Sequence, residues 1–292
     1  MSLRGRYVID RIKGVVSKHF RLPCPPYGDP TYWDKAYASF GPNDSYEWGD
    51  VSLSDVKEYE YHPIEWDTQQ SSSNPSSTTR QSTLADSLNV DSYDSKAIES
   101  KRQQSVLMLG CGNSKLGEEM VTEGGFEGPI VQVDVSSNVV EIMRQRCSDL
   151  VAKGNMNFVQ DDATELSAFR DGMVDACLDK GLLDAIFCAE DFHQLHQIQN
   201  TISRVLRPGG WFVFFSFSRP EFLLPKLLMA NEVSSTSVRN RNPMAWKNVE
   251  VQQLSKILLY KMQKIEDSDR SDAYVNNKRL VRSKANRKAQ RR

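Results

Sequence analysis

A short apolar run that leads into a glycine turn is the feature of this sequence with the clearest chemistry. Residues 106–109 (VLML) are wholly apolar and run directly into GCGNS at 110–114. The apolar run predicts a strand covered on both faces, as in a parallel sheet, and residues 115 to about 122 predict a helix. Glycine lets the backbone approach a ligand without a side-chain clash, so Gly110 and Gly112 predict a nucleotide cradle.

A second apolar run ends in an acid. Ile130–Val133 predicts the next strand, and Asp134 follows it about 20 residues beyond the glycine turn. A carboxylate at this place can accept hydrogen bonds from the two hydroxyls of a ribose. A single G-x-G is weak evidence, but together with the flanking strand, the helix and Asp134 it indicates a nucleoside site.

The spacing of the glycines indicates which nucleoside-containing cofactor fits. A dinucleotide site would have G-x-G-x-x-G, and here Lys115 occupies the third glycine position. No G-x-x-x-x-G-K-[ST] phosphate loop is present either. The pattern favours a cofactor with one nucleoside and no pyrophosphate, which points to S-adenosylmethionine, and it disfavours a nicotinamide-dependent oxidoreductase.

The elements that must position these residues alternate along the chain. Beyond the first two strands, we expect strands at 157–160, 174–178, 211–215, about 246–254 and 257–262, a helix at about 192–205 and a turn at 207–210 (RPGG). This alternation predicts an α/β three-layer sandwich. Ligands bind at the carboxyl ends of such strands, where Asp134, Asp162 and Asp179 all fall. An acid at position 162 can accept from an adenine amino group.

Several segments together resemble a known family. They are LGCGNS, VDVS, DDAT, LDKGLLDA and RVLRPGGWF, with YWDKAY at 32–37 and YEWGD at 46–50 upstream. The set resembles class I S-adenosylmethionine-dependent methyltransferases. More narrowly, it is similar to the methyltransferase-like protein-lysine subfamily, which includes elongation factor 1-alpha lysine methyltransferases and citrate synthase lysine methyltransferase. The resemblance covers about 27–50 and 105–265, and it implies a Rossmann-like, seven-stranded, mostly parallel sheet with helices on both faces.

The resemblance also implies a set of site residues. In this family an aromatic N-terminal segment folds over the cofactor. The implied cofactor-binding residues are Trp33, Tyr37, Trp48, Gly110, Gly112, Asp134, Val135, Asp162, Ala163 and Lys180. For Lys180 the alternative is a structural ion pair with a nearby acid.

Methyl transfer is an in-line displacement, and a lysine nucleophile must first lose its proton. Asp179 and Asp184 are the candidate catalytic carboxylates, with Asp179 ranked first because it ends a strand. For Asp184 a helix-start or packing role is an equal alternative.

Composition limits the other classes of function. The net charge of −1 excludes a globally basic nucleic-acid binder, and no apolar run is long enough to cross a membrane. The five cysteines are odd in number and form no C-x-x-C pair, which excludes a disulfide framework, disfavours a structural zinc site and fits a reducing compartment. His193 and His196 share a helix face but have no partner ligands in pattern, so we expect no metal.

The chain is expected to divide into five parts. They are a basic extension (1–26), an aromatic cofactor-covering segment (27–66), a Ser-rich disordered insert (67–104), a methyltransferase core (105–265) and a basic disordered tail (266–292). The extension has two readings: a surface helix or a mitochondrial presequence. The tail, with eight Lys or Arg in its last seventeen residues, could contact RNA or the ribosome, or only increase solubility. We expect a cytoplasmic protein, with mitochondrial as the alternative.

Three hypotheses of function follow. The first is methylation of a protein lysine, with elongation factor 1-alpha as the favoured partner. The second is another substrate for the same core, either citrate synthase or a small molecule, because fold does not fix substrate. The third is an inactive cofactor-binding adaptor. The strand-four end lacks N-P-P-Y or D-P-P-Y and a Pro-Cys pair, which disfavours methylation of adenine or amide nitrogen and of cytosine carbon.

Overall fold

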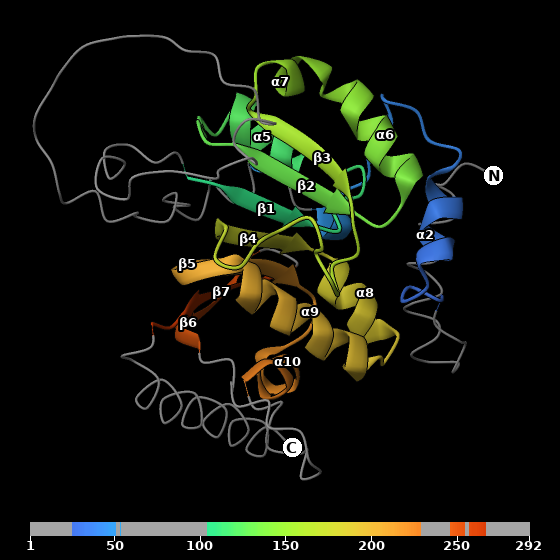
Figure 1. Ribbon diagram of the computed structural model, residues 1–292. Helices are drawn as coiled ribbons and strands as arrows, with labels where there is room; N and C mark the ends of the chain where they lie inside the picture. Colours follow the sequence, from blue (N-terminus) through green and yellow to red (C-terminus); the bar gives the residue numbers. More distant parts are fainter. Residues whose placement is uncertain (1–24, 51–52, 54–103, 229–245, 255–256, 267–292) are drawn as a thin grey trace, which may run out of the picture.

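A computed structural model gives the structure of the chain, and it describes residues 25–50, 53, 104–228, 246–254 and 257–266. The helices and strands of this part are arranged around one sheet (Figure 1). Nearly all of the expected N-terminal extension, of the Ser-rich insert and of the basic tail lies outside the described residues. The boundaries of these three segments therefore stay predictions.

One seven-stranded sheet forms the centre of the fold. Its strands are β1 (Val106–Leu109), β2 (Ile130–Asp134), β3 (Met156–Gln160), β4 (Val174–Lys180), β5 (Leu206–Ser216), β6 (Trp246–Gln253) and β7 (Leu258–Lys264). Their order is β3-β2-β1-β4-β5-β7-β6, and β7 is antiparallel to both of its neighbours. Successive strands are added first to one side of β1 and then to the other. The switch point, where ligands bind in such sheets, therefore lies between β1 and β4.

Helices cover both faces of the sheet. On one face lie α5 (Leu116–Thr122), α6 (Ser137–Arg146) and α7 (Ser148–Ala152), and on the other lie α8 (Leu182–Cys188), α9 (Phe192–Val205) and α10 (Pro220–Leu228) (Figure 1). A further helix, α2 (Pro30–Tyr37), precedes the sheet in sequence and packs beside α6. Side chains cap the N-termini of α2, α6 and α9: Asp29, Ser136 and Asp191 each accept a hydrogen bond from a backbone N–H of the helix that follows.

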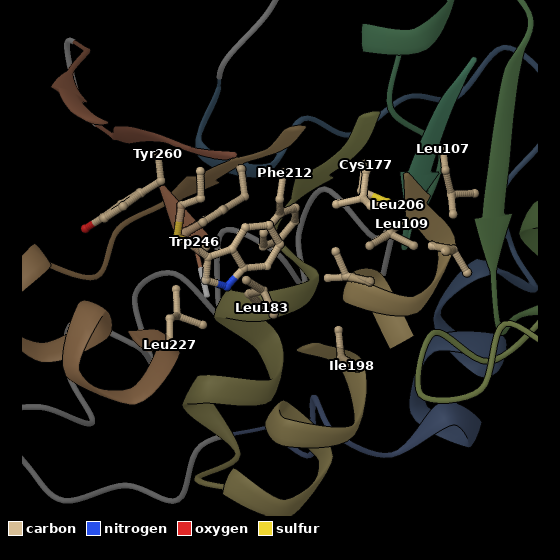
Figure 2. Packing of buried hydrophobic residues seen from close by; sticks show 14 of the residues in the cluster. Leu107, Leu109, Cys177, Leu183, Ile198, Leu206, Phe212, Leu227, Trp246 and Tyr260 are labelled. Atoms are coloured by element: carbon tan, nitrogen blue, oxygen red, sulfur yellow. The ribbon is translucent and has the colours of Figure 1, made fainter. Parts of the chain in front are cut away.

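Two apolar clusters hold the layers together, one on each face of the sheet. On the α8–α10 face, Leu107, Cys177 and Phe212 of the sheet point towards Leu183 and Ile198 of the helices (Figure 2). Every residue of β4 is buried, as expected for a central parallel strand with helices on both sides.

The predicted α/β class, the seven strands and their mostly parallel arrangement are confirmed. Six of the seven predicted strands match an observed strand within two residues at each end, and the predicted helix at 192–205 matches α9. The fifth strand, predicted at 211–215, begins five residues earlier, at Leu206. The RPGG segment differs: it lies inside β5, where Val174 pairs with Leu206 but Ala176 pairs with Trp211. The extra residues form a bulge rather than a turn that precedes the strand, and Gly209 supplies its left-handed backbone at φ +74°.

Within the described part of the chain, no helix combines the length and the apolar character that a membrane crossing requires.

Candidate active site

A pocket opens at the carboxyl ends of β1, β2 and β4. Its volume is about 900 Å³ with its open mouth included. All of the sequence-predicted cofactor residues line it: Trp33, Tyr37, Trp48, Gly110, Gly112, Asp134, Val135, Asp162, Ala163 and Lys180. The structure therefore brings all ten of these residues to one cavity.

The glycine turn forms the floor of the pocket. Gly110 and Gly112 adopt φ +55° and +51°, in the left-handed region that favours glycine. A Cβ on Gly110 would lie 2.9 Å from Leu182 Cβ, and one on Gly112 would lie 2.6 Å from the Tyr37 hydroxyl oxygen. Neither position has room for a side chain, so both glycines are required by backbone conformation and by space.

Asp134 stands beside the turn, and its carboxylate is held from two sides. The oxygens accept hydrogen bonds from Gly112 N (2.9 Å) and Ser136 N (3.0 Å). Burial raises the pKa of Asp134, while these backbone bonds act to lower it. The two bonds orient the carboxylate and leave its other lone pairs for a ligand.

Aromatic rings from the N-terminal segment form another wall. Tyr27 stacks on Trp33 with 5.6 Å between ring centroids, and Trp33 stacks on Tyr37 at 6.2 Å. Helix α2 carries two of these rings, and Asp34 fixes it to the start of α6 by accepting from Ser136 Oγ at 2.8 Å. Hydrogen bonds as well as apolar packing therefore place the aromatic wall.

Glu47 joins the aromatic segment to the floor of the pocket. Its carboxylate accepts from Ser114 Oγ (2.8 Å) and Lys115 N (2.6 Å), and it forms an ion pair with Lys180. The Lys180 side chain is only 3% exposed and that of Glu47 is 22% exposed. Lys180 lines the pocket, so the cofactor-contact reading and the ion-pair reading of this residue are compatible.

The two predicted catalytic carboxylates are placed differently from the cofactor residues. Neither Asp179 nor Asp184 is among the residues that line the pocket. Asp179 is fully buried and accepts from Leu182 N (2.8 Å) and Leu183 N (3.0 Å) at the start of α8. Burial raises the pKa of Asp179 to about 7. Each of its two oxygens therefore accepts a hydrogen bond from the backbone at the start of α8.

Asp184 is also buried, in the first turn of α8. It accepts from Trp48 Nε1 (3.2 Å), Phe217 N (3.0 Å) and Ser216 Oγ. Burial raises the pKa of Asp184, and the bonds from Ser216, Phe217 and Trp48 oppose that rise. These contacts are the ones that the packing alternative for Asp184 describes, and its catalytic role stays a prediction.

Two unsatisfied acceptors test whether the pocket fits S-adenosylmethionine. Asn113 Oδ1 and Gln194 Oε1 are buried, belong to pocket-lining residues and have no hydrogen-bond partner among the described residues. Asn113 Nδ2 donates to Asp44 O at 3.1 Å, which fixes the identity of the remaining atom as oxygen. Buried acceptors of this kind call for donors from a ligand. The amino groups and hydroxyls of S-adenosylmethionine are such donors, so the lining fits this cofactor.

Comparison with known proteins agrees with this geometry. A family profile described as a methyltransferase domain matches residues 100–268. The chain belongs to this methyltransferase family. It is a class I S-adenosylmethionine-dependent methyltransferase, and its sequence resembles the protein-lysine subfamily.

Curated relatives of this methyltransferase are similar over part of their length. The mouse eEF1A lysine and N-terminal methyltransferase is 33% identical over 42% of this chain, which spans 17% of that protein. The bovine EEF1A lysine methyltransferase 4 is 29% identical over 67% of this chain and 64% of its own length. The chain thus spans about a sixth of the first of these relatives and just under two thirds of the second.

Solved structures match at lower identity. A SAM-dependent methyltransferase from Methanosarcina mazei is 17% identical, with a TM-score of 0.41 over 61% of this chain and 100% of that one. A putative methyltransferase from Methanococcus maripaludis is 16% identical, with a TM-score of 0.40 over 56% and 78% of the two chains.

Sequence reasoning missed several residues of the site. Glu47, Ser114 and Gln194 were not singled out, although Glu47 lies inside the YEWGD segment that carried the resemblance. Its neighbour Trp48 was selected and the acid was not. The available signal was the position of this acid between two aromatic residues, which makes it a candidate partner for the charge of Lys180.

Among the described residues no group of three or more His, Cys, Asp or Glu could hold a metal ion.

Proposed function

We propose that this methyltransferase transfers a methyl group to the side-chain amine of a protein lysine, with elongation factor 1-alpha as the favoured substrate. The observation that carries the proposal is the junction of the YEWGD segment with the DKG end of β4, through the Glu47–Lys180 ion pair. These are the two segments on which the resemblance to the lysine-specific subfamily rests. Two relatives named for eEF1A lysine methylation support the same substrate class.

Bound S-adenosylmethionine would supply an electrophilic methyl group on a sulfonium. The residues that would hold it are those of the pocket wall. Asp134 would accept from the ribose hydroxyls, Asp162 would lie at the adenine, and the glycine turn would lie against the methionine part. Trp33 and Tyr37 would exclude water from that side. A displacement at a sulfonium needs no metal, because breaking the bond between the methyl carbon and the positive sulfur releases a neutral thioether, which is a good leaving group.

The chain would increase the rate by aligning the lysine nucleophile with the methyl group and by excluding water. In this proposal Asp179 holds the start of α8 and Asp184 holds Trp48, so both act by positioning other groups. Since their carboxylate oxygens already accept backbone or side-chain donors, we assign neither a proton-transfer step. The lysine ammonium would lose its proton to solvent at the open mouth of the pocket before attack.

Methyl transfer into a cell extract tests the proposal. Radiolabelled S-adenosylmethionine would be added with the parent protein or with Asp134→Ala, and labelled bands would be read by mass spectrometry for methyl-lysine. A band near the mass of elongation factor 1-alpha that needs the parent protein supports the proposal. Label in small molecules alone would refute it, and a citrate synthase band would move the substrate to the alternative. Cofactor binding with no transfer would favour the adaptor hypothesis.

A further inference from the structure

An exposed aromatic ring stands next to the pocket wall without a role in the core. Phe217 follows the last residue of β5, and 49% of its surface is exposed. Its ring centroid lies 6.5 Å from that of Trp48, which lines the pocket. A Cβ at Gly49 would lie 3.3 Å from Phe217 Cζ. The ring therefore extends the aromatic wall outwards from the pocket.

Buried polar groups hold this exposed ring in place. Phe217 N donates to Asp184 Oδ2 at 3.0 Å, and the same oxygen accepts from Trp48 Nε1 at 3.2 Å. Ser216 Oγ donates to Asp184 and accepts from Ser218 N at 3.0 Å. One buried carboxylate thus joins the Trp48 ring of the pocket wall to the backbone that carries the exposed ring.

A row of rings connects Phe217 with the cofactor wall. Phe217 is near Trp48, Trp48 meets Tyr27 edge-on at 6.2 Å, and Tyr27 stacks on Trp33. Phe217 is the end of this row that faces solvent. Aromatic side chains are enriched among the residues that contribute most to binding at protein interfaces, so an exposed ring beside an enzyme pocket is suited to contact a macromolecular substrate.

The chemistry of the ring indicates what it would contact. The aliphatic stem of a lysine packs on apolar surface while its head group remains polar, and a cation is attracted to an aromatic face. The chain contains such a contact itself: Lys226 Nζ lies 3.7 Å from the centroid of the Phe192 ring. A substrate segment that carries a lysine therefore suits Phe217.

We propose that Phe217 contacts the protein substrate beside the target lysine and sets substrate affinity, and that Asp184 is the positioning residue that fixes Phe217 against Trp48. This inference rests on the proposed function, because it needs a protein substrate. It assigns Phe217 to substrate binding and not to the cofactor.

Steady-state kinetics with elongation factor 1-alpha test it, together with calorimetric binding of S-adenosylmethionine. Phe217→Ala should raise KM for the protein substrate at least tenfold and leave the Kd for the cofactor within twofold of the parent. The matched control is Phe222→Ala, which removes a ring that is 46% exposed on α10 and should stay within twofold in both measurements. Phe217→Tyr, which keeps the ring, should restore most of the affinity.

A double-mutant cycle tests the positioning role. Asp184→Asn should raise KM, and adding Phe217→Ala should raise it little further, because both changes disable the same contact. Independent, multiplicative effects would refute the role of Asp184. An unchanged KM in Phe217→Ala, or a loss of cofactor affinity equal to the loss of substrate affinity, would overturn the role of Phe217. If the parent methylates no protein lysine at all, the proposed function fails, and that result is distinct from either of these.

Discussion

The ion pair between Glu47 and Lys180 predicts that replacing Glu47 and replacing Lys180 lower the stability of the fold by different amounts. The Lys180 side chain is 3% exposed, whereas that of Glu47 is 22% exposed and also accepts from Ser114 Oγ and Lys115 N. Glu47→Gln leaves a buried ammonium facing a neutral amide. Lys180→Met leaves a carboxylate that keeps two donors and some contact with water. The first change should therefore cost more than the second.

The magnitudes follow from burial. Breaking a buried ion pair costs about 3–5 kcal/mol, and the partial exposure of Glu47 lowers this, so we expect about 2–4 kcal/mol for Glu47→Gln. Lys180→Met should cost about 1 kcal/mol or less, because Glu47 retains its other partners. For a domain of this size each kcal/mol lowers Tm by about 2–4 °C. The double variant should be at least about 1 kcal/mol more stable than the sum of the single changes predicts.

Thermal and urea unfolding of the four proteins measure this cycle, and calorimetry on the same samples gives the Kd for S-adenosylmethionine. Glu47→Gln should also weaken cofactor binding, since Glu47 ties the aromatic segment to the glycine turn. A Tm for Glu47→Gln within 1 °C of the parent would refute the reasoning, as would strictly additive losses in the double variant.

Three further predictions concern the pocket and its supports. Gly181→Ala should lower stability by about 3 kcal/mol, because Gly181 has φ +112° and a Cβ there would lie 2.6 Å from Trp48 Cγ. The control is Gly154→Ala, at φ +75° with open space around it, which should cost only about 1 kcal/mol. Equal losses of stability in urea unfolding would count against the clash with Trp48. Asp134→Asn should weaken cofactor binding at least tenfold in calorimetry, because an amide cannot accept from Gly112 N, Ser136 N and two hydroxyls together; an unchanged Kd would exclude the ribose role. Asp179 has a pKa raised to about 7 by burial, so its protonated form is favoured in the folded state: its contribution to stability is complete below pH 4 and is lost as the pH rises to 7 and above. The stability of the parent relative to Asp179→Asn should therefore fall between about pH 4 and pH 7 in urea unfolding and level off above pH 7, and a constant difference would show that Asp179 does not titrate in this range.

Much of the fold could be predicted because its signals are local. The apolar strands and the glycine turn are contiguous runs whose meaning depends on neighbouring residues. Asp134 could be placed for the same reason, since the end of a parallel strand defines one edge of the sheet. The bulge in β5 could not, because RPGG is also a good turn sequence, and only the pairing of β5 with β4 decides between the two.

Site residues could be predicted where a strand end or a turn sets their position. They could not be predicted where a contact between distant parts of the chain sets it. Asp179 and Asp184 have the residue type and the sequence position of catalytic acids. In the structure their oxygens accept from the N–H groups of α8 and from the side chains of Trp48 and Ser216, and neither residue lines the pocket, so a catalytic role for them stays a prediction. Glu47 and Phe217 owe their places to contacts that span about 130 and 170 residues of chain with Lys180 and Trp48. A single sequence does not display such pairings.

The central claim is that this pocket directs a methyl group onto a protein lysine. The most direct test is mass spectrometry of purified elongation factor 1-alpha after incubation with the protein and S-adenosylmethionine. The account predicts a mass increase of one or more methyl groups on the amine of a single lysine, absent with Asp134→Asn. Unmodified lysines, with the cofactor bound and another acceptor methylated instead, would contradict it.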